Sequence, residues 1–451
     1  MRIGRFVNLK GDLFATTFSF GAQAVIKFGS SMILTRILRP ADYGVLTILM
    51  SIIFVVEMLA DLGVGIFIVR DPKGDEPRYL NTAWTMRLAR AVLNTCVLLI
   101  FGPLIAEHFY HAPQLSLPLR VISLWFVLAA LESMAFPLAV RRKRSRIIVY
   151  SELVSTFIAT SFTIVYCHYS RDYWGMIFGT LLSRVLMATI SYFYYPENRP
   201  RLQWDRAAAA EVLKFTRYTM PSSLLTLGLS QFDKVVFLRL FDLNLLGVYG
   251  LAGNIAGSVE SLISKISQMV LYPRVAHNFR EDPASFTRKY YSENMKLFAS
   301  VLLLPAALGG SAQFLITLLY PPRYAMAGPV LQAFMLRAAL LAFAQPAEDL
   351  LIAAGEYQVI LMGNVYRAVS LLAGSLAGYF FFGFLGFVYG VALSGLPPLL
   401  YYLWLQRSKG FMILRYEAYK IAFFMGIALS SYLASSLLLY LWPTAHIRIR
   451  I

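Results

Sequence analysis

The chain has 451 residues, of which 58% are hydrophobic and only 14% are charged. So few charged residues cannot cover the surface of a soluble protein of this length, which excludes a water-soluble globular protein and indicates a polytopic membrane protein. The net charge of +17 does not indicate nucleic acid binding, because the basic residues fall in short loops between apolar stretches. Both cysteines, Cys96 and Cys167, lie inside apolar stretches, so we expect neither a disulfide framework nor a zinc site.

Apolar stretches long enough to cross a bilayer recur along the whole chain. Each crossing needs about 20 apolar residues, and on this criterion the fold class is all-α with 12 to 14 transmembrane helices. The thirteen predicted helices cover residues 12–38, 42–69, 82–107, 115–140, 147–168, 173–195, 212–240, 245–273, 292–320, 325–353, 358–382, 384–405 and 416–442.

The basic residues concentrate in every second connection, as in the run from Arg141 to Arg146. By the positive-inside rule this pattern predicts a cytoplasmic N-terminus. The N-terminal segment has no signal-peptide cleavage pattern, so we expect a permanent first helix. With thirteen spans the C-terminus would lie outside, although Arg448 and Arg450 suit the cytoplasm. Either a fourteenth helix exists or the last helix does not cross.

The chain contains a weak internal repeat. Identical residues recur at a constant offset: Arg36, Gly44, Val45, Ile52, Val56, Glu57 and Leu59 match Arg239, Gly247, Val248, Ile255, Val259, Glu260 and Leu262. A further echo sets Pro137 of the fourth helix against Pro346 of the tenth. The repeat predicts two six-helix bundles, 1–205 and 206–408, and an extra C-terminal helix within 409–451. Six helices preserve orientation, so the halves form a parallel repeat with a site expected at their interface near the midplane.

Several basic residues lie deep inside predicted spans, where a charge costs about 2.5 to 3.5 kcal/mol on insertion scales. They are Lys27, Arg184, Lys234, Arg337 and Arg367. Five cations on five helices could line one cavity for an anionic substrate such as a diphosphate, which the planar guanidinium group binds in a bidentate manner. Alternatively, several pair with carboxylates on neighbouring helices or snorkel. Arg87 and Arg90 lie near a cytoplasmic end, where we expect snorkelling.

Acidic residues also lie within the spans, and we interpret four of them, Glu57, Asp61, Asp233 and Glu260, as candidates for ion coupling or gating. A fifth acidic residue, Glu132, lies deep in the fourth helix. A buried carboxylate can carry a proton through a transport cycle. Alternatively, Asp233 only neutralises Lys234, and Glu57 pairs with Lys27.

Motifs of enzymes and nucleotide-driven pumps are absent from the sequence. It contains no GxxxxGK[ST] loop, no HExxH or GxSxG motif and no metal-ligand cluster. We therefore expect no catalytic residues, no cofactor and no metal, and interpret the chain as a transporter, not an enzyme.

Three sequence features resemble one family. The turn after the first predicted helix is flanked by Arg36 and Gly44, and the turn after the seventh is flanked in the same way by Arg239 and Gly247. The run LGVYGLA occupies 246–252, and Leu271-Tyr272-Pro273 closes the eighth helix. These features resemble the polysaccharide transporter branch of the multidrug/oligosaccharidyl-lipid/polysaccharide exporter superfamily, which includes Wzx-type flippases.

The resemblance implies two helical bundles around a central cavity that opens alternately to either side of the membrane. It implies passage of undecaprenyl-pyrophosphate-linked repeat units of O-antigen, capsule or exopolysaccharide across the bacterial inner membrane. Besides this lipid-linked oligosaccharide and the membrane lipids, polysaccharide assembly proteins are implied as partners.

Other functions stay open from the sequence. A drug/cation antiporter of the same superfamily would favour an acidic, aromatic cavity, which the mid-helix Lys and Arg residues disfavour. A peptidoglycan lipid-precursor flippase would carry the same lipid diphosphate. A membrane-embedded polysaccharide polymerase or ligase would need a sizeable outer loop with catalytic groups, and the predicted outer loops are short.

Overall fold

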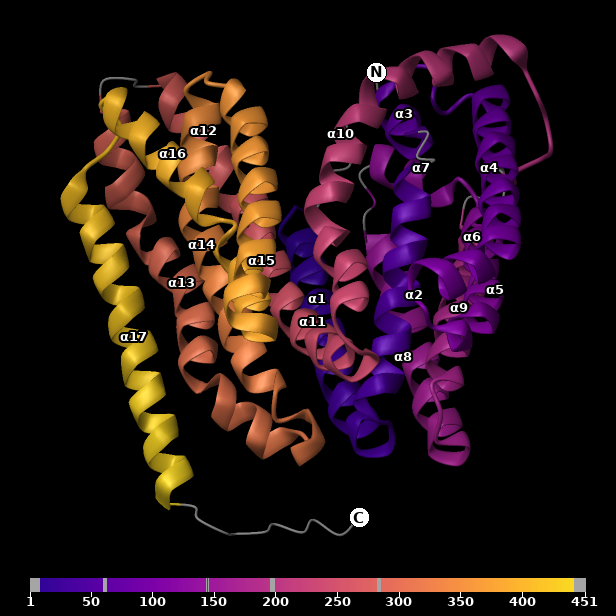
Figure 1. The fold of residues 1–451 in the computed structure, drawn as a ribbon. Coiled ribbons are helices and arrows are strands. Elements are labelled where there is room, and N and C mark those ends of the chain that lie inside the picture. The colour runs from indigo at the N-terminus through magenta and orange to yellow at the C-terminus, as the bar shows by residue number, and fades with distance from the viewer. Residues whose placement is uncertain are drawn as a thin grey trace. The chain divides into compact units, whose positions relative to one another are not determined.

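The computed structural model describes residues 9–59, 63–142, 144, 146–194, 199–281 and 285–441 (Figure 1). Every regular element in these ranges is a helix, and each predicted span overlaps one. Nine helical segments within them are long and apolar enough to cross a bilayer. This confirms the prediction of an all-α, polytopic membrane protein.

Contacts divide the chain into two compact units, Met1–Gly247 and Val248–Ile451. The domain limits that the repeat predicts, after residues 205 and 408, remain predictions. In the first unit, α8 packs on α1 and α9, and α2 packs on α10. The helices of this unit are α1 (Leu9–Ile37), α2 (Pro40–Leu59), α3 (Val64–Arg70), α4 (Pro77–Leu104), η1 (Ile105–Phe109), η2 (Pro113–Leu115), α5 (Ser116–Ile122), α6 (Leu124–Ala130), α7 (Ala135–Arg141), α8 (Arg146–Ser170), α9 (Trp174–Ser191), α10 (Arg206–Leu240) and the first turn of α11 (Leu243–Ile266).

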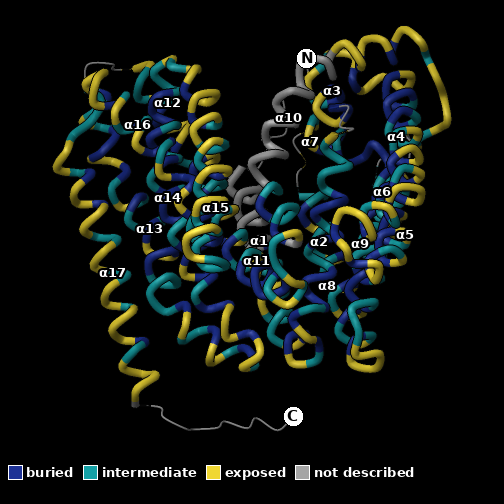
Figure 2. The backbone as a smooth tube through the Cα atoms, in the orientation of Figure 1, coloured by how far each residue is buried: buried dark blue, intermediate teal, exposed yellow. Residues whose placement is uncertain are grey.

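The second unit is built around α14. Two thirds of the span in α14 is buried (67%), whereas only 6% of the span in α17 is, so α17 presents most of its surface outward (Figure 2). After α11 its helices are η4 (Ser267–Leu271), α12 (Tyr272–Glu281), α13 (Phe286–Leu319), η5 (Pro322–Tyr324), α14 (Ala327–Ala353), α15 (Gln358–Leu393), α16 (Leu396–Ser408) and α17 (Leu414–Leu441).

Small residues bring α17 close to α13. A side chain at Gly310 would overlap the carbonyl of Ala428, and the hydroxyls of Ser431 and Ser435 donate to the carbonyls of Ala307 and Gly310. Because apolar side chains gain little by leaving lipid, such close backbone packing and interhelical hydrogen bonds are what hold membrane helices together. The C-terminal helix is therefore attached to the second unit through α13.

The fourth predicted span, 115–140, is wrong as one continuous helix. It consists of α5, α6 and α7, with a single turn residue, Ser123, between α5 and α6 and a non-helical segment at 131–134 before α7 begins. Pro137 lies in the first turn of α7, where a proline is well tolerated because the amides of this turn have no partner within the helix. The second predicted span is also interrupted, because Gly63 has φ 60° and α3 begins after it.

The predicted division at Gly383 is present. Gly383 has φ 62° and ψ −138°, so α15 contains two helices joined by a tight turn. The two helices run back along each other with glycines at the contact, because a side chain at Gly378 would overlap the carbonyl of Gly386, and one at Gly390 would overlap that of Gly374. Residues 358–382 and 384–408 therefore form a helical hairpin.

The repeat-related glycines meet each other within the first unit. A side chain at Gly44 in α2 would overlap the carbonyl of Leu243, and one at Gly247 in α11 would overlap the carbonyl of Pro40. Pro40 and Leu243 occupy matching positions of the repeat, so the contact is reciprocal. Glycine is required at both positions because only a residue without a Cβ allows the two backbones to approach this closely.

Candidate functional site

Charged side chains inside the first unit form a connected group around the break in the fourth span. Glu57, on α2, forms an ion pair with Arg90, on α4, whose side chain is only 13% exposed. Most residues of α2 from Pro40 to Ile53 are buried. The Glu57 carboxylate follows this buried part of the helix and lies against α4. Glu57 therefore pairs with Arg90 and not with Lys27, which is exposed on α1.

Arg87 satisfies the carbonyl groups that the break leaves open. Its guanidinium donates to the carbonyl oxygen of Ala130 at 3.0 Å and to that of Glu132. The last carbonyls of a helix lack partners within that helix and carry partial negative charge, so a cation at this end is favourable. The expectation that Arg87 and Arg90 snorkel was wrong, because both side chains turn inward to partners on other helices.

Two serines and a threonine hold the same broken span from other sides. Ser133 donates its amide to the hydroxyl of Ser191 at 2.8 Å and its hydroxyl to the Ser191 carbonyl at 2.9 Å. The Thr95 hydroxyl donates to the carbonyl of Ser123 at 3.1 Å. Every one of these bonds links a break in the span to a neighbouring helix, so the irregular backbone is satisfied inside protein, as a membrane requires.

Arg184, on α9, is the predicted cation nearest to this break. Its guanidinium lies 3.5 Å from the Glu132 carboxylate and stacks over the Trp125 ring at 4.5 Å from the ring centroid. The Arg184 side chain remains 36% exposed. The three guanidinium groups of Arg87, Arg90 and Arg184 lie near the carboxylates of Glu57 and Glu132. Glu152, on α8, also interacts electrostatically with Glu132, so the formal charges of these groups balance.

In the second unit the structure brings together two residues that the sequence selected separately. The Arg337 guanidinium, on α14, binds both carboxylate oxygens of Glu260, on α11, at 2.7 and 3.2 Å. The same guanidinium stacks over Phe334 at 4.6 Å. A bidentate pair of this kind is among the stronger polar contacts in proteins, and here the two opposite charges balance.

The remaining predicted residues have different surroundings. Lys234 donates to Gln231 at 3.3 Å, and the neighbouring Asp233 is buried on α10. Arg367, on α15, interacts electrostatically with Glu348, on α14. Asp61 lies outside the described residues. The roles of all these residues in substrate binding or coupling remain predictions.

Sequence reasoning missed three acidic groups within the second unit. Asp349 is buried on α14, beside Glu348, and Glu417, on α17, forms an ion pair with Lys420 at 2.7 Å and accepts a hydrogen bond from Tyr291 at 2.8 Å. The signal was present, because each acid interrupts an apolar stretch in the same way as Glu57 and Glu260 do. Within the residues searched, no three His, Cys, Asp or Glu side chains gather as a metal site.

A surface network ties the start of α10 to the start of α4. Asp205 caps α10 by accepting from the Ala208 amide at 2.9 Å, and this bond, with Arg78 at 3.9 Å, lowers the pKa of Asp205. The carboxylate of Glu211 lies 3.6 Å from Lys73 and raises the pKa of that amine. These contacts are exposed, so water screens them.

The fold and the apolar spans define a multi-pass membrane protein. The inward-closed conformation of the lipid II flippase MurJ superposes with a TM-score of 0.69 at 12% identity, over 96% of this chain and 92% of that one. An inward-facing multidrug resistance transporter of the MATE family and MOP superfamily gives 0.68 at 14%, over 88% and 95%. At such low identity these likenesses establish the fold alone.

Residues 33–328 match the family model described as polysaccharide biosynthesis protein, and the chain belongs to this family. The lipopolysaccharide biosynthesis protein WzxC of Escherichia coli K12 is 22% identical over 365 residues, which are 80% of this chain and 73% of that protein. The amylovoran biosynthesis protein AmsL of Erwinia amylovora is 24% identical over 232 residues, 51% of this chain and 59% of that protein. The succinoglycan biosynthesis transport protein ExoT of Rhizobium meliloti is 22% identical over 80% of this chain and 72% of its own length.

Proposed function

We propose that this protein is a flippase that moves a polyprenyl-diphosphate-linked oligosaccharide across the bacterial inner membrane by alternating access. Its family, and relatives named for polysaccharide biosynthesis and transport, support a lipid-linked glycan as the cargo. The carrying observation is the group of three guanidiniums and two carboxylates within the spans of the first unit.

A partly exposed guanidinium within a span suits an anionic headgroup. Arg184 is the member of the group best placed to exchange its contact with Glu132 for one with the cargo. Arg337 is less suited, because its Nε and Nη2 groups already donate to the Glu260 carboxylate. A drug/cation antiporter would favour an acidic cavity, which the arginines of this group disfavour. A polymerase or ligase is disfavoured because one relative, ExoT, is named as a transport protein.

The test is mass spectrometry of lipids that copurify with the detergent-solubilised protein. We expect a polyprenyl-diphosphate glycan with the wild type and about tenfold less with Arg184→Ala, since a hydrogen bond to a charged group contributes about 1.5 to 3 kcal/mol. Arg120→Ala is the matched control, because Arg120 is an exposed arginine outside the group. Equal retention by all three proteins would remove Arg184 from the site, and an organic cation in place of the lipid would favour the antiporter.

The proposal includes a cytoplasmic N-terminus and coupling to a proton or cation gradient, for which the sequence predicts Glu57, Asp61, Asp233 or Glu260 as candidate residues. It also includes contact with other polysaccharide assembly proteins. Transport by vesicles that is indifferent to pH and ion gradients, and unchanged in Glu57→Gln with Glu260→Gln, would exclude coupling at these two glutamates.

A further inference from the structure

Asp349 is a buried carboxylate in an apolar part of the second unit. It is 5% exposed and accepts hydrogen bonds from the Ser267 hydroxyl and, at 3.4 Å, from the Gln345 amide. The ion pairs of the described residues join other carboxylates to basic groups, and none of them includes Asp349. A carboxylate buried without a cation is costly in its charged form, so neutralisation by a bound proton is favoured.

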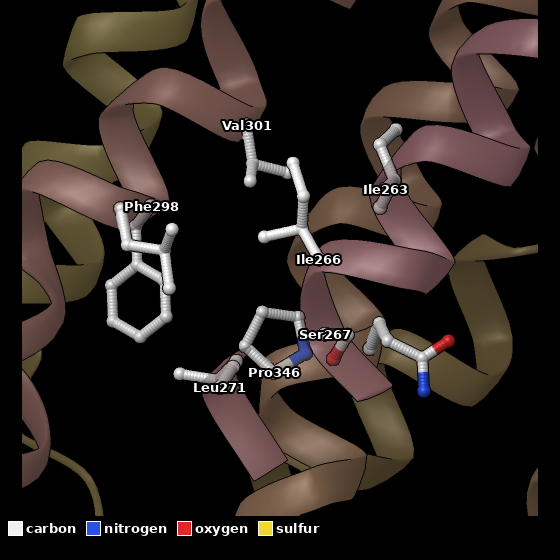
Figure 3. A pocket seen from close by; sticks show the side chains of 9 residues that line it. Ile263, Ile266, Ser267, Leu271, Phe298, Val301 and Pro346 are labelled. Carbon is white, nitrogen blue, oxygen red and sulfur yellow. The ribbon is translucent and has the colours of Figure 1, made fainter. Parts of the chain in front are cut away.

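A cavity of about 10 Å³ lies beside Ser267, and this volume is at the lower limit of the space that one water needs. Ser267, Phe298 and Pro346 line it from η4, α13 and α14 (Figure 3), and Gln345 is also among its lining residues. Asp349 does not itself line the cavity, and the Ser267 hydroxyl, which donates to Asp349, connects the two. The rest of the lining is apolar. Since hard metal ions take about six oxygen ligands, this lining does not suit a metal ion.

The turn of α14 around Asp349 is held by three neighbouring elements. The Tyr290 hydroxyl, on α13, donates to the Pro346 carbonyl at 3.0 Å, and the Gln406 amide, on α16, donates to the Ala347 carbonyl at 3.2 Å. Ser267 begins η4, a single π-helical turn, and such turns occur often at functional sites. A change of charge on Asp349 therefore acts on the one turn to which η4, α13 and α16 are all bonded.

The other titratable groups near this turn have partners or are exposed. Glu348 interacts with Arg367 of α15 and Tyr402 of α16, and on α17 Glu417 is paired with Lys420. Facing Asp349 from α13 is the Tyr290 phenol, and Lys265 precedes Ser267 on α11. The charged side chains of α12, which also packs on α14, are exposed: Arg274, His277, Arg280 and Glu281.

We propose that Asp349 is the site at which this protein binds and releases a proton, by way of the cavity beside Ser267. The inference rests on the proposed transport function, for which it supplies the coupling ion. Glu57 and Glu260 suit this role less, because each forms an ion pair with an arginine and a proton bound there would break that pair. Asp349 is not among the identical residues of the internal repeat, from which Glu57 and Glu260 were chosen.

The test is infrared difference spectroscopy of the reconstituted protein as the pH is changed, which requires neither cargo nor transport. We expect the C=O stretching band of a protonated carboxylic acid to appear as the pH falls. The band should be lost in Asp349→Asn and kept in Glu348→Gln, the matched control one residue away. In Ser267→Ala, which keeps the carboxyl group, the band should move to higher frequency, because its carbonyl loses a hydrogen-bond donor.

Two results would overturn the inference. One is a spectrum of Asp349→Asn identical to that of the wild type, with Ser267→Ala also unchanged. The other is a band that Na⁺ abolishes at constant pH, which would assign a metal ion to the site in place of a proton. If the infrared band behaves as expected but the reconstituted protein does not translocate a lipid-linked glycan, the proton site is supported and the proposed cargo is contradicted.

Discussion

Two turns that contain a proline, around Pro137 and Pro346, satisfy the hydrogen bonds of their backbones in different ways. Around Pro137 the span breaks into α6 and α7, and the cation of Arg87 binds the open carbonyls of Ala130 and Glu132. Around Pro346, α14 continues as a helix, and the neutral Tyr290 and Gln406 bind carbonyls of that turn. The first turn therefore lies among arginines and glutamates, and the second holds a carboxylate that forms no ion pair among the described residues.

This difference shows that two prolines within spans can leave their turns in different electrostatic surroundings. The turn whose carbonyls bind a guanidinium has further charged partners, since Glu132 also pairs with Arg184. The turn whose carbonyls bind neutral donors leaves its buried acid without a cation, and such an acid can bind a proton. Under the two proposals above, cargo binding and proton binding would belong to different turns of the chain.

The largest expected effect is the loss of the cation at the first turn. Arg87→Ala leaves the buried carbonyls of Ala130 and Glu132 without a donor, at about 1 to 3 kcal/mol for each. We expect a clearly lower temperature of thermal unfolding in detergent, followed by tryptophan fluorescence. Arg120→Ala, at an exposed site, should unfold as the wild type does, and an equal loss in both variants would contradict the assigned role of Arg87.

The contact between matching glycines gives the next largest effect. Gly247→Ala places a methyl group against the Pro40 carbonyl, and Gly44→Ala places one against Leu243. Overpacking typically costs about 1 to 3 kcal/mol, and we expect similar losses of thermal stability in the two variants. Gly257→Ala, on the same helix α11 with open space around it, should change little. Unequal losses at Gly44 and Gly247 would show that the contact is not reciprocal.

Removing a neutral donor at the second turn should cost less. Tyr290→Phe takes one hydroxyl from the Pro346 carbonyl, for an expected loss of about 1 kcal/mol, measured by the same thermal unfolding. Tyr291→Phe is the neighbouring control, because its hydroxyl binds Glu417 and not α14. In the infrared experiment only Tyr290→Phe should shift the Asp349 band. A loss as large as that of Arg87→Ala would erase the contrast between the two turns.

The smallest effect is expected outside the membrane, at the start of α10. Because the Ala208 amide lowers the pKa of Asp205, this cap stabilises the helix above the ordinary aspartate pKa and is lost as the pH falls through the lowered value. Hydrogen exchange in the first turn of α10 should accelerate below about pH 4 relative to other exposed helix starts. The same acceleration in Asp205→Asn, which cannot titrate, would contradict this assignment.

Much of the fold could be predicted because the lengths of the apolar stretches and the positions of the glycines largely determine where the helices begin and end. The turn at Gly383 was predicted from a glycine between two apolar stretches, and it is present. The break at 131–134 was not predicted. An apolar sequence is the same whether its backbone carbonyls accept hydrogen bonds within the helix or from an arginine of another helix. Only the tertiary contact of Arg87 reveals it.

The candidate site was predicted by residue type and not by pairing. Glu260 and Arg337 were both selected as charges inside spans, but nothing in the sequence indicates that they bind each other across α11 and α14. Arg90 was set aside because its place near a helix end is typical of snorkelling. Asp349 was missed although it interrupts an apolar helix as plainly as Glu57 does.

The measurement that tests the central claim most directly is translocation in proteoliposomes that contain a purified polyprenyl-diphosphate oligosaccharide. A membrane-impermeant glycosidase added outside reports the glycan that has reached the outer leaflet. We predict that the cleaved fraction rises past its initial plateau only in vesicles with the wild-type protein, and much more slowly with Arg184→Ala. A plateau equal to that of protein-free vesicles, for a protein that is folded and binds the lipid, would contradict the proposed function.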